Sequence, residues 1–144
     1  MIYFLDTSVL VKRYIAEPGS DAVRRLLRRK VEVAVARVTE AEAYSAIARA
    51  TRMGVITADQ RTEAFEKLGE DLAAARMVEI RRAVVSAVRE LVLRWSLRGY
   101  DAIQLACAMR LASEGLAVDL WCADGELAAA ARGEGLRTTV VRTA

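Results

Sequence analysis

Short apolar runs of β-forming residues recur along the chain and predict buried strands. The first run is Ile2–Leu5, and similar runs occupy residues 31–36 and 117–122. Apolar residues at consecutive positions are typical of a strand covered on both faces, as in a parallel sheet. Weaker runs at residues 77–80 and 138–142 predict two further strands.

Apolar residues at three- and four-residue spacing predict helices between these strands. Residues 101–112 are apolar nearly all round, which predicts a central helix covered on both sides. A stripe ending at Trp95 predicts a helix over residues 82–97. Other helices are expected over residues 7–16, after Ser20, from Thr39, from Thr57 and over residues 124–132.

Strands that alternate with helices predict an α/β fold, with a central parallel sheet covered on both faces. The chain has 144 residues, which is the usual size of one domain, and no linker or repeat interrupts it. We therefore expect a single domain over residues 1–144.

Composition narrows the class of protein further. Hydrophobic residues make up 54% and charged residues 28% of the chain, which excludes a disordered protein. No apolar stretch reaches the roughly 18 residues of a membrane span, and the N-terminus lacks signal-peptide features. We expect no membrane partner and a cytoplasmic location.

Two cysteines without a C-x-x-C pattern exclude a zinc ribbon and a disulfide framework, and are expected to be small buried residues.

The chain contains no histidine, which excludes Ser-His-Asp triads, histidine bases and histidine-bound zinc. Hydrolysis would need carboxylates, hydroxyls or a hard metal ion.

The net charge is +3, and only Lys12, Lys30 and Lys67 of the 22 basic residues are lysines. Arginine suits contact with phosphate, but an arginine-rich genome explains the same composition equally well.

Acidic residues follow two of the predicted strands. Asp6 comes directly after the first strand, and Asp124 follows the strand over residues 117–122. Sites in open α/β sheets form beyond the carboxyl ends of strands. Carboxylates brought together there repel one another, and Mg²⁺ supplies the opposite charge through oxygen ligands.

A structural interpretation of the same acids stays open. Asp6, Asp101 and Asp124 all stand at predicted helix starts, where aspartate is a favoured N-cap. Thr39 and Glu42 fit a capping box, in which the glutamate reaches back to the threonine amide. Taken singly, each acid is more often structural than catalytic.

Four segments taken in order resemble the PIN-domain family, and within it the VapC-like toxins of prokaryotic toxin–antitoxin pairs. Each segment is short, but together they cover essentially the whole chain. The segments are residues 2–10 (IYFLDTSVL), 39–42 (TEAE), 101–106 (DAIQLA) and 122–127 (CADGEL).

The resemblance implies a Rossmann-like α/β/α sandwich and Mg²⁺- or Mn²⁺-dependent cleavage of single-stranded RNA. It assigns catalysis and metal binding to Asp6, Glu42, Asp101 and Asp124, with a supporting hydroxyl at Thr7 or Ser8. It also implies a homodimer and a VapB-like antitoxin as partners. One departure is Cys122, which stands where the family often has serine or threonine.

Basic residues near these segments suggest an RNA path, although solvated faces are the commoner explanation for such charges. The candidates are Lys12, Arg13, Arg49 and Arg98. Asp119 is expected to be a surface charge.

Two other functions stay open: a PIN nuclease for RNA processing or structured DNA without an antitoxin, and a catalytically silent PIN interaction module.

Overall fold

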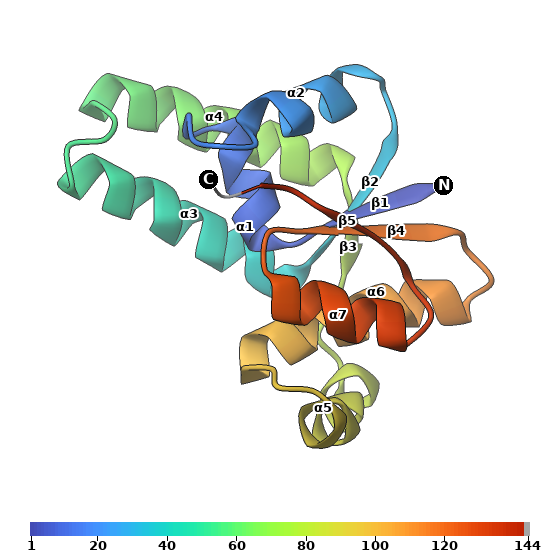
Figure 1. Cartoon of the computed structure of the whole chain (residues 1–144). Coiled ribbons are helices and arrows are strands. Elements are labelled where there is room, and N and C mark those ends of the chain that lie inside the picture. The colour runs from blue at the N-terminus through green and yellow to red at the C-terminus, as the bar shows by residue number, and fades with distance from the viewer. Residues whose placement is uncertain (143–144) are drawn as a thin grey trace.

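The computed structural model describes residues 1–142 as helices layered on both faces of one parallel sheet (Figure 1). All strand pairs are parallel, and the five strands lie in the order β3-β2-β1-β4-β5. This confirms the predicted α/β/α sandwich. The strands are β1 (Ile2–Leu5), β2 (Glu32–Ala36), β3 (Arg76–Val78), β4 (Val118–Cys122) and β5 (Arg137–Val140).

The helices divide into two layers, each with its own apolar core. One face of the sheet packs against the first four helices, and the other against α6 and α7, with α5 lying outside α6 (Figure 1). The helices are α1 (Thr7–Leu10), α2 (Ser20–Arg28), α3 (Arg37–Arg52), α4 (Ala58–Ala74), α5 (Arg82–Arg94), α6 (Gly99–Ser113) and α7 (Gly125–Gly133), and a 3₁₀ helix, η1 (Val11–Arg13), follows α1.

The strand order places a switch in winding direction at the centre of the sheet. The chain moves outward from β1 through β2 to β3, and then returns to β4 on the other side of β1. Loops leave in opposite directions at such a point, which creates a crevice at the carboxyl ends of the two central strands. Asp6 and Asp124 lie at these ends.

Several predicted helix boundaries were wrong. The first helix was expected to run to residue 16, but α1 ends at Leu10 and continues only as the 3₁₀ turn to Arg13. Helix α3 begins at Arg37, before Thr39, because the backbone turns directly from β2 into the helix at Ala36. Helix α6 likewise begins at Gly99, before Asp101. Helix α5 ends at Arg94, and the backbone is extended at the following residue.

None of the helices within residues 1–142 combines the length and the apolar character that crossing a bilayer requires.

Candidate active site

Asp6 occupies the turn that joins β1 to α1, and its carboxylate caps the short helix. Its Oδ2 accepts hydrogen bonds from the Ser8 hydroxyl at 2.5 Å and from the Ser8 amide at 3.4 Å. The side chain is only 6% exposed. A buried carboxylate with so few donors is costly as an anion, so this position calls for an added positive charge.

Asp124 occupies the equivalent turn after β4. Its Oδ1 accepts a hydrogen bond from the Glu126 amide at 3.0 Å, which caps α7. Strands β1 and β4 pair directly, and the Asp6 amide donates to the Trp121 carbonyl at 3.0 Å. The two aspartates therefore end neighbouring strands at the same edge of the sheet.

Glu42 and Asp101 come from helices on opposite faces of the sheet. Glu42 lies in the second turn of α3, where its Oε1 accepts a hydrogen bond from the Thr7 hydroxyl at 2.8 Å. The capping-box interpretation is wrong here, because α3 begins before Thr39 and the Thr39 hydroxyl is bonded elsewhere. Asp101 lies in the first turn of α6 and is partly buried.

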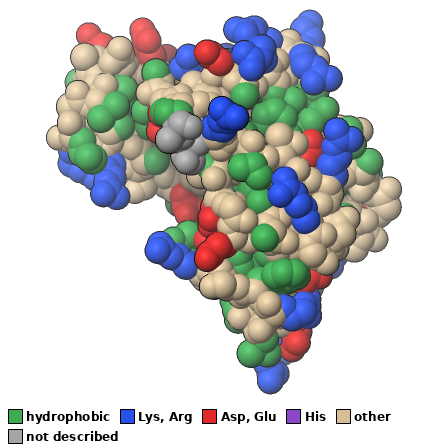
Figure 2. Space-filling model, viewed as in Figure 1, with side chains coloured by type: hydrophobic (Ala, Val, Ile, Leu, Met, Phe, Trp, Pro, Cys, Tyr) green, Lys and Arg blue, Asp and Glu red, His purple; other side chains and the backbone are tan. Residues whose placement is uncertain are grey.

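The structure brings these four acids to one depression, which we call the acid hollow. It consists of two adjoining recesses that share Asp6, Ser8, Tyr100 and Asp101. In Figure 2, acidic side chains gather in the recess between the α3–α4 arm and the lower helices. The first recess also contains Thr7, Val11, Ala41, Glu42, Ser45, Ala46 and Arg49, and the second Arg98, Ala123, Asp124 and Glu126.

Burial and mutual repulsion disfavour ionisation of these carboxyls. Burial raises the pKa of Asp6, the Ser8 hydrogen bonds lower it, and the charge of Glu42 raises it again. The pKa of Asp101 is raised to about 6, first by burial and then by the charges of Asp6 and Asp124. The acid hollow therefore carries negative charge that nearby cations do not fully offset.

This chemistry fits a hard divalent cation. Carboxylate oxygens are the ligands that Mg²⁺ and Mn²⁺ favour, and a cation would offset the burial and the repulsion that raise the pKa values of Asp6 and Asp101. Within residues 1–142, however, no three acidic side chains converge closely enough to enclose an ion. Asp6 and Glu42 instead accept hydrogen bonds from Ser8 and Thr7, respectively.

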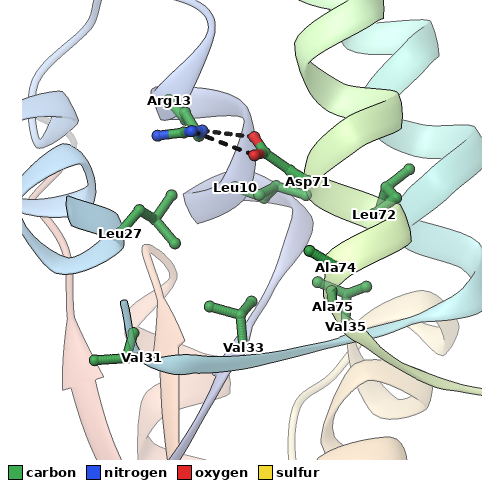
Figure 3. Close-up of a pocket in the computed structure, with 10 residues that line it drawn as sticks. All are labelled: Leu10, Arg13, Leu27, Val31, Val33, Val35, Asp71, Leu72, Ala74 and Ala75. Atoms are coloured by element: carbon green, nitrogen blue, oxygen red, sulfur yellow. Dashed lines mark hydrogen bonds and ion pairs between the residues drawn. The ribbon is translucent and has the colours of Figure 1, made fainter. Parts of the chain in front are cut away.

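The four basic candidates fall into two pairs. Arg49 and Arg98 are exposed and line the acid hollow. Lys12 is 3% exposed, and its ammonium group donates to Glu17 and to the Pro18 carbonyl. Arg13 donates two hydrogen bonds to Asp71, beside a separate apolar cavity over β2 (Figure 3). The structure therefore does not bring Lys12 and Arg13 into the hollow.

Sequence reasoning gave no role to Gln104 and treated Thr39 only as a cap. Both side chains are buried, and the Gln104 amide donates to Thr39 and Thr7 and lies 3.4 Å from Glu42 Oε1. The feature of the sequence that could have drawn attention to Gln104 is that it is a polar residue within a helix that is otherwise apolar nearly all round. Cys122, at the variant family position, is buried and its thiol contacts the Asp124 carbonyl oxygen at 3.7 Å.

Comparison with known proteins places this chain in a family. The family model described as PIN domain matches residues 3–120. Ribonuclease VapC45 of Mycobacterium tuberculosis (strain CDC 1551 / Oshkosh) is 31% identical over 121 residues, which cover 84% of this chain and 83% of that protein. Ribonuclease VapC46 of Mycobacterium tuberculosis (strain ATCC 25618 / H37Rv) is 35% identical over 109 residues, which cover 75% of each.

Solved structures share the fold at lower sequence identity. FitAcB from Neisseria gonorrhoeae has a TM-score of 0.70 and 17% identity, over 96% of both chains. VapBC2 from Rickettsia felis, solved with a DNA fragment from its promoter, has a TM-score of 0.66 and 16% identity, over 98% of this chain and 99% of that one. These likenesses support the architecture of the sheet and its two helical layers.

Proposed function

Because this chain belongs to the PIN-domain family, we propose that it is a metal-dependent endoribonuclease that cleaves single-stranded RNA, the toxin of a type II toxin–antitoxin pair. The observation that carries the proposal is the acid hollow, where carboxylates from α3, α6 and the ends of β1 and β4 line two adjoining recesses that share Asp6 and Asp101. The curated relatives, which match over most of their length, are named as ribonucleases.

Asp6, Glu42, Asp101 and Asp124 would hold Mg²⁺ or Mn²⁺ in this hollow. When bound, such a cation would neutralise charge on the phosphodiester and make a water molecule a better nucleophile. The protein's own contribution is orientation: Ser8 fixes a carboxylate oxygen of Asp6, and Thr7 fixes one of Glu42.

Arg49 and Arg98 would hold the RNA backbone on either side of the acids. Both guanidinium groups are exposed at the hollow, where they can reach phosphate oxygens without losing a buried partner. Arg98 also donates to the Tyr100 hydroxyl at 2.8 Å, which places an aromatic ring beside the same path. A base could stack on this ring.

The test of the proposal is cleavage of RNA by the purified chain, free of any partner, with sequencing of the new RNA ends. We expect cleavage with Mg²⁺ or Mn²⁺ and none with EDTA. Asp6→Asn should lower the rate about a hundredfold or more, because even residues that only support metal ligands contribute about 10- to 100-fold. Asp59→Asn removes the same charge from an exposed position outside the hollow and should cleave normally. Undiminished cleavage by Asp6→Asn would refute the proposed site.

An antitoxin of the VapB type and a second copy of this chain are the proposed protein partners. Structural neighbours include a toxin–antitoxin complex from Klebsiella pneumoniae with a TM-score of 0.63, which supports a partner of this class. Co-expression with the product of an adjacent small reading frame should give a stable complex that no longer cleaves RNA. Light scattering of the isolated chain should give the mass of a dimer.

A further inference from the structure

Gln104 is a polar side chain in the middle of the most apolar helix. It is 1% exposed, and its neighbours on α6 belong to the core between α6 and the sheet. Its Nε2 donates to Thr39 Oγ1 at 2.9 Å and to Thr7 Oγ1 at 3.1 Å, and lies 3.4 Å from Glu42 Oε1. One amide group therefore connects α1, α3 and α6 behind the acid hollow.

The other end of the Gln104 amide is not satisfied. Its Oε1 is buried and has no hydrogen-bond partner within residues 1–142. A buried carbonyl without a partner is unfavourable, and an apolar side chain of similar size would fill the space without that cost. Packing alone therefore does not account for a glutamine at this position.

The neighbours of Gln104 explain which way the amide points. An ionised glutamate can only accept hydrogen bonds, so the group beside Glu42 Oε1 must be a donor. Turning the amide over would place its carbonyl oxygen against that carboxylate. The Thr7 hydroxyl donates to Glu42 Oε1 at 2.8 Å, and it lies 3.0 Å from the Thr39 hydroxyl.

We propose that Gln104 is a positioning residue that orients the Glu42 carboxylate toward the acid hollow, acting directly and through Thr39 and Thr7. The donors all converge on Oε1 of Glu42, and the described residues donate no hydrogen bond to Oε2. Oε2 is thereby left for a ligand in the hollow. This inference rests on the proposed function, because it takes Glu42 to be a metal ligand.

Thr39 is the second member of this arrangement. Its side chain is fully buried in the first turn of α3, where it accepts the shortest of the hydrogen bonds from Gln104. Replacing its hydroxyl by a methyl group conserves volume and removes the acceptor. Gln104 would then keep its place but lose the contact that fixes its rotation.

The experiment measures Mn²⁺ affinity by calorimetry, without RNA, for the wild type and three variants. Gln104→Leu removes the donors and should weaken Mn²⁺ binding about 10- to 100-fold, the range for residues that orient metal ligands. Thr39→Val should weaken it several-fold. Ser20→Ala removes buried hydrogen bonds to Glu17 and Ile15, away from the hollow, and should leave the affinity unchanged.

RNA cleavage by the same variants separates orientation from loss of structure. Gln104→Leu should lower kcat at limiting Mn²⁺ while KM for RNA stays within about twofold, and saturating Mn²⁺ should restore much of kcat. A folded Gln104→Leu with wild-type Mn²⁺ affinity overturns the inference. If Gln104→Leu does not fold, an unchanged affinity in folded Thr39→Val overturns it.

The outcomes also distinguish this inference from the proposed function. A wild-type chain that binds Mn²⁺ but does not cleave RNA would refute the nuclease proposal, and the affinities of the variants would still decide the role of Gln104. A wild-type chain that cleaves RNA, with a Gln104→Leu variant equal to it in Mn²⁺ affinity, would refute only the positioning role. A wild-type chain that binds no Mn²⁺ would refute both.

Discussion

Asp101 shows how its surroundings change the behaviour of one carboxyl group. It is partly buried in the first turn of α6, and the negative charges of Asp6 and Asp124 act on it from the ends of two strands. Arg98 acts in the opposite sense and lowers its pKa. Burial and repulsion outweigh the arginine, so the pKa rises to about 6.

The titration of Asp101 in metal-free protein tests this balance. Carbon NMR of the side-chain carboxyl should give a midpoint near pH 6. Asp124→Asn should lower that midpoint, because it removes a repelling charge, whereas Asp59→Asn should leave it unchanged. A midpoint near the ordinary aspartate value of about 4 would contradict the described burial and repulsion.

Other single residues show where local patterns mislead. Asp119 was expected to be a surface charge, but it is 2% exposed and accepts hydrogen bonds from Trp121 and Thr139. Its place in a central strand was predictable, but its partner on β5 was not. The acids of the hollow were named because they follow strands or match family segments. Gln104 was missed because no pattern along the chain shows which side chains meet behind Glu42.

At the scale of elements, the C-terminal ends of α5 and α7 meet through Trp95 and through Arg94, whose guanidinium group donates to Glu134 at 3.0 Å. The ring of Trp95 lies against Gly133 at the end of α7, and its Nε1 donates to Glu134 at 3.0 Å. The expected helix over residues 82–97 does not reach this far, because the extended backbone at Trp95 turns the indole toward α7. Periodicity placed Trp95 on the apolar stripe correctly, but could not show that contact with α7 replaces the last helical turn.

Gly133→Ala should therefore destabilise the fold. A Cβ at this position would lie 2.1 Å from Cη2 of Trp95, and the indole cannot retreat without losing its bond to Glu134. We expect a loss of about 1–3 kcal/mol in the free energy of unfolding, measured with urea.

Gly69→Ala is the matched control for this prediction. Gly69 lies inside α4, and its Cβ would meet only the Tyr44 hydroxyl at 3.6 Å, an ordinary contact. The substitution should raise the free energy of unfolding by about 0.5–1 kcal/mol, because alanine favours helix. A similar change in both variants would show that the contact between Trp95 and Gly133 does not constrain α7.

At the scale of the whole molecule, the alternation of strands and helices predicted the parallel sheet and its two helical layers. The strand order was not predictable in the same way, because apolar runs do not specify which strands are neighbours. The pairing of β1 with β4 brings Asp6 and Asp124 together, and it depends on packing between residues more than 100 positions apart. The carboxyl-end rule still indicated the correct edge of the sheet.

Mg²⁺ should stabilise the whole molecule more strongly as the pH rises. The pKa of Asp101 is raised to about 6, so at pH 5 a proton occupies this carboxyl, whereas at pH 8 the carboxyl is ionised and free to bind a cation. Burial raises the pKa of Asp6 in the same direction. For the same reason, the free energy of unfolding of the metal-free protein should fall as the pH rises from about 4 toward 6. Over this range the folded state still holds carboxyl protons that the unfolded chain has already released.

Calorimetric Tm values with and without Mg²⁺ check this expectation. At a free concentration a hundred times Kd, binding adds about 2.7 kcal/mol of stability. The increase in Tm should be greater at pH 8 than at pH 5, and should be much smaller in Asp6→Asn. An increase that does not depend on pH would mean that Mg²⁺ acts outside the acid hollow.

The pairing of β1 with β4 also has a consequence for synthesis of the chain. A ribosome delivers Asp124 only 118 residues after Asp6, yet the two lie at the ends of adjoining strands. A nascent chain shorter than this cannot complete the acid set, whatever it has already folded. The growing polypeptide thus stays without an assembled acid hollow until Asp124 has been made.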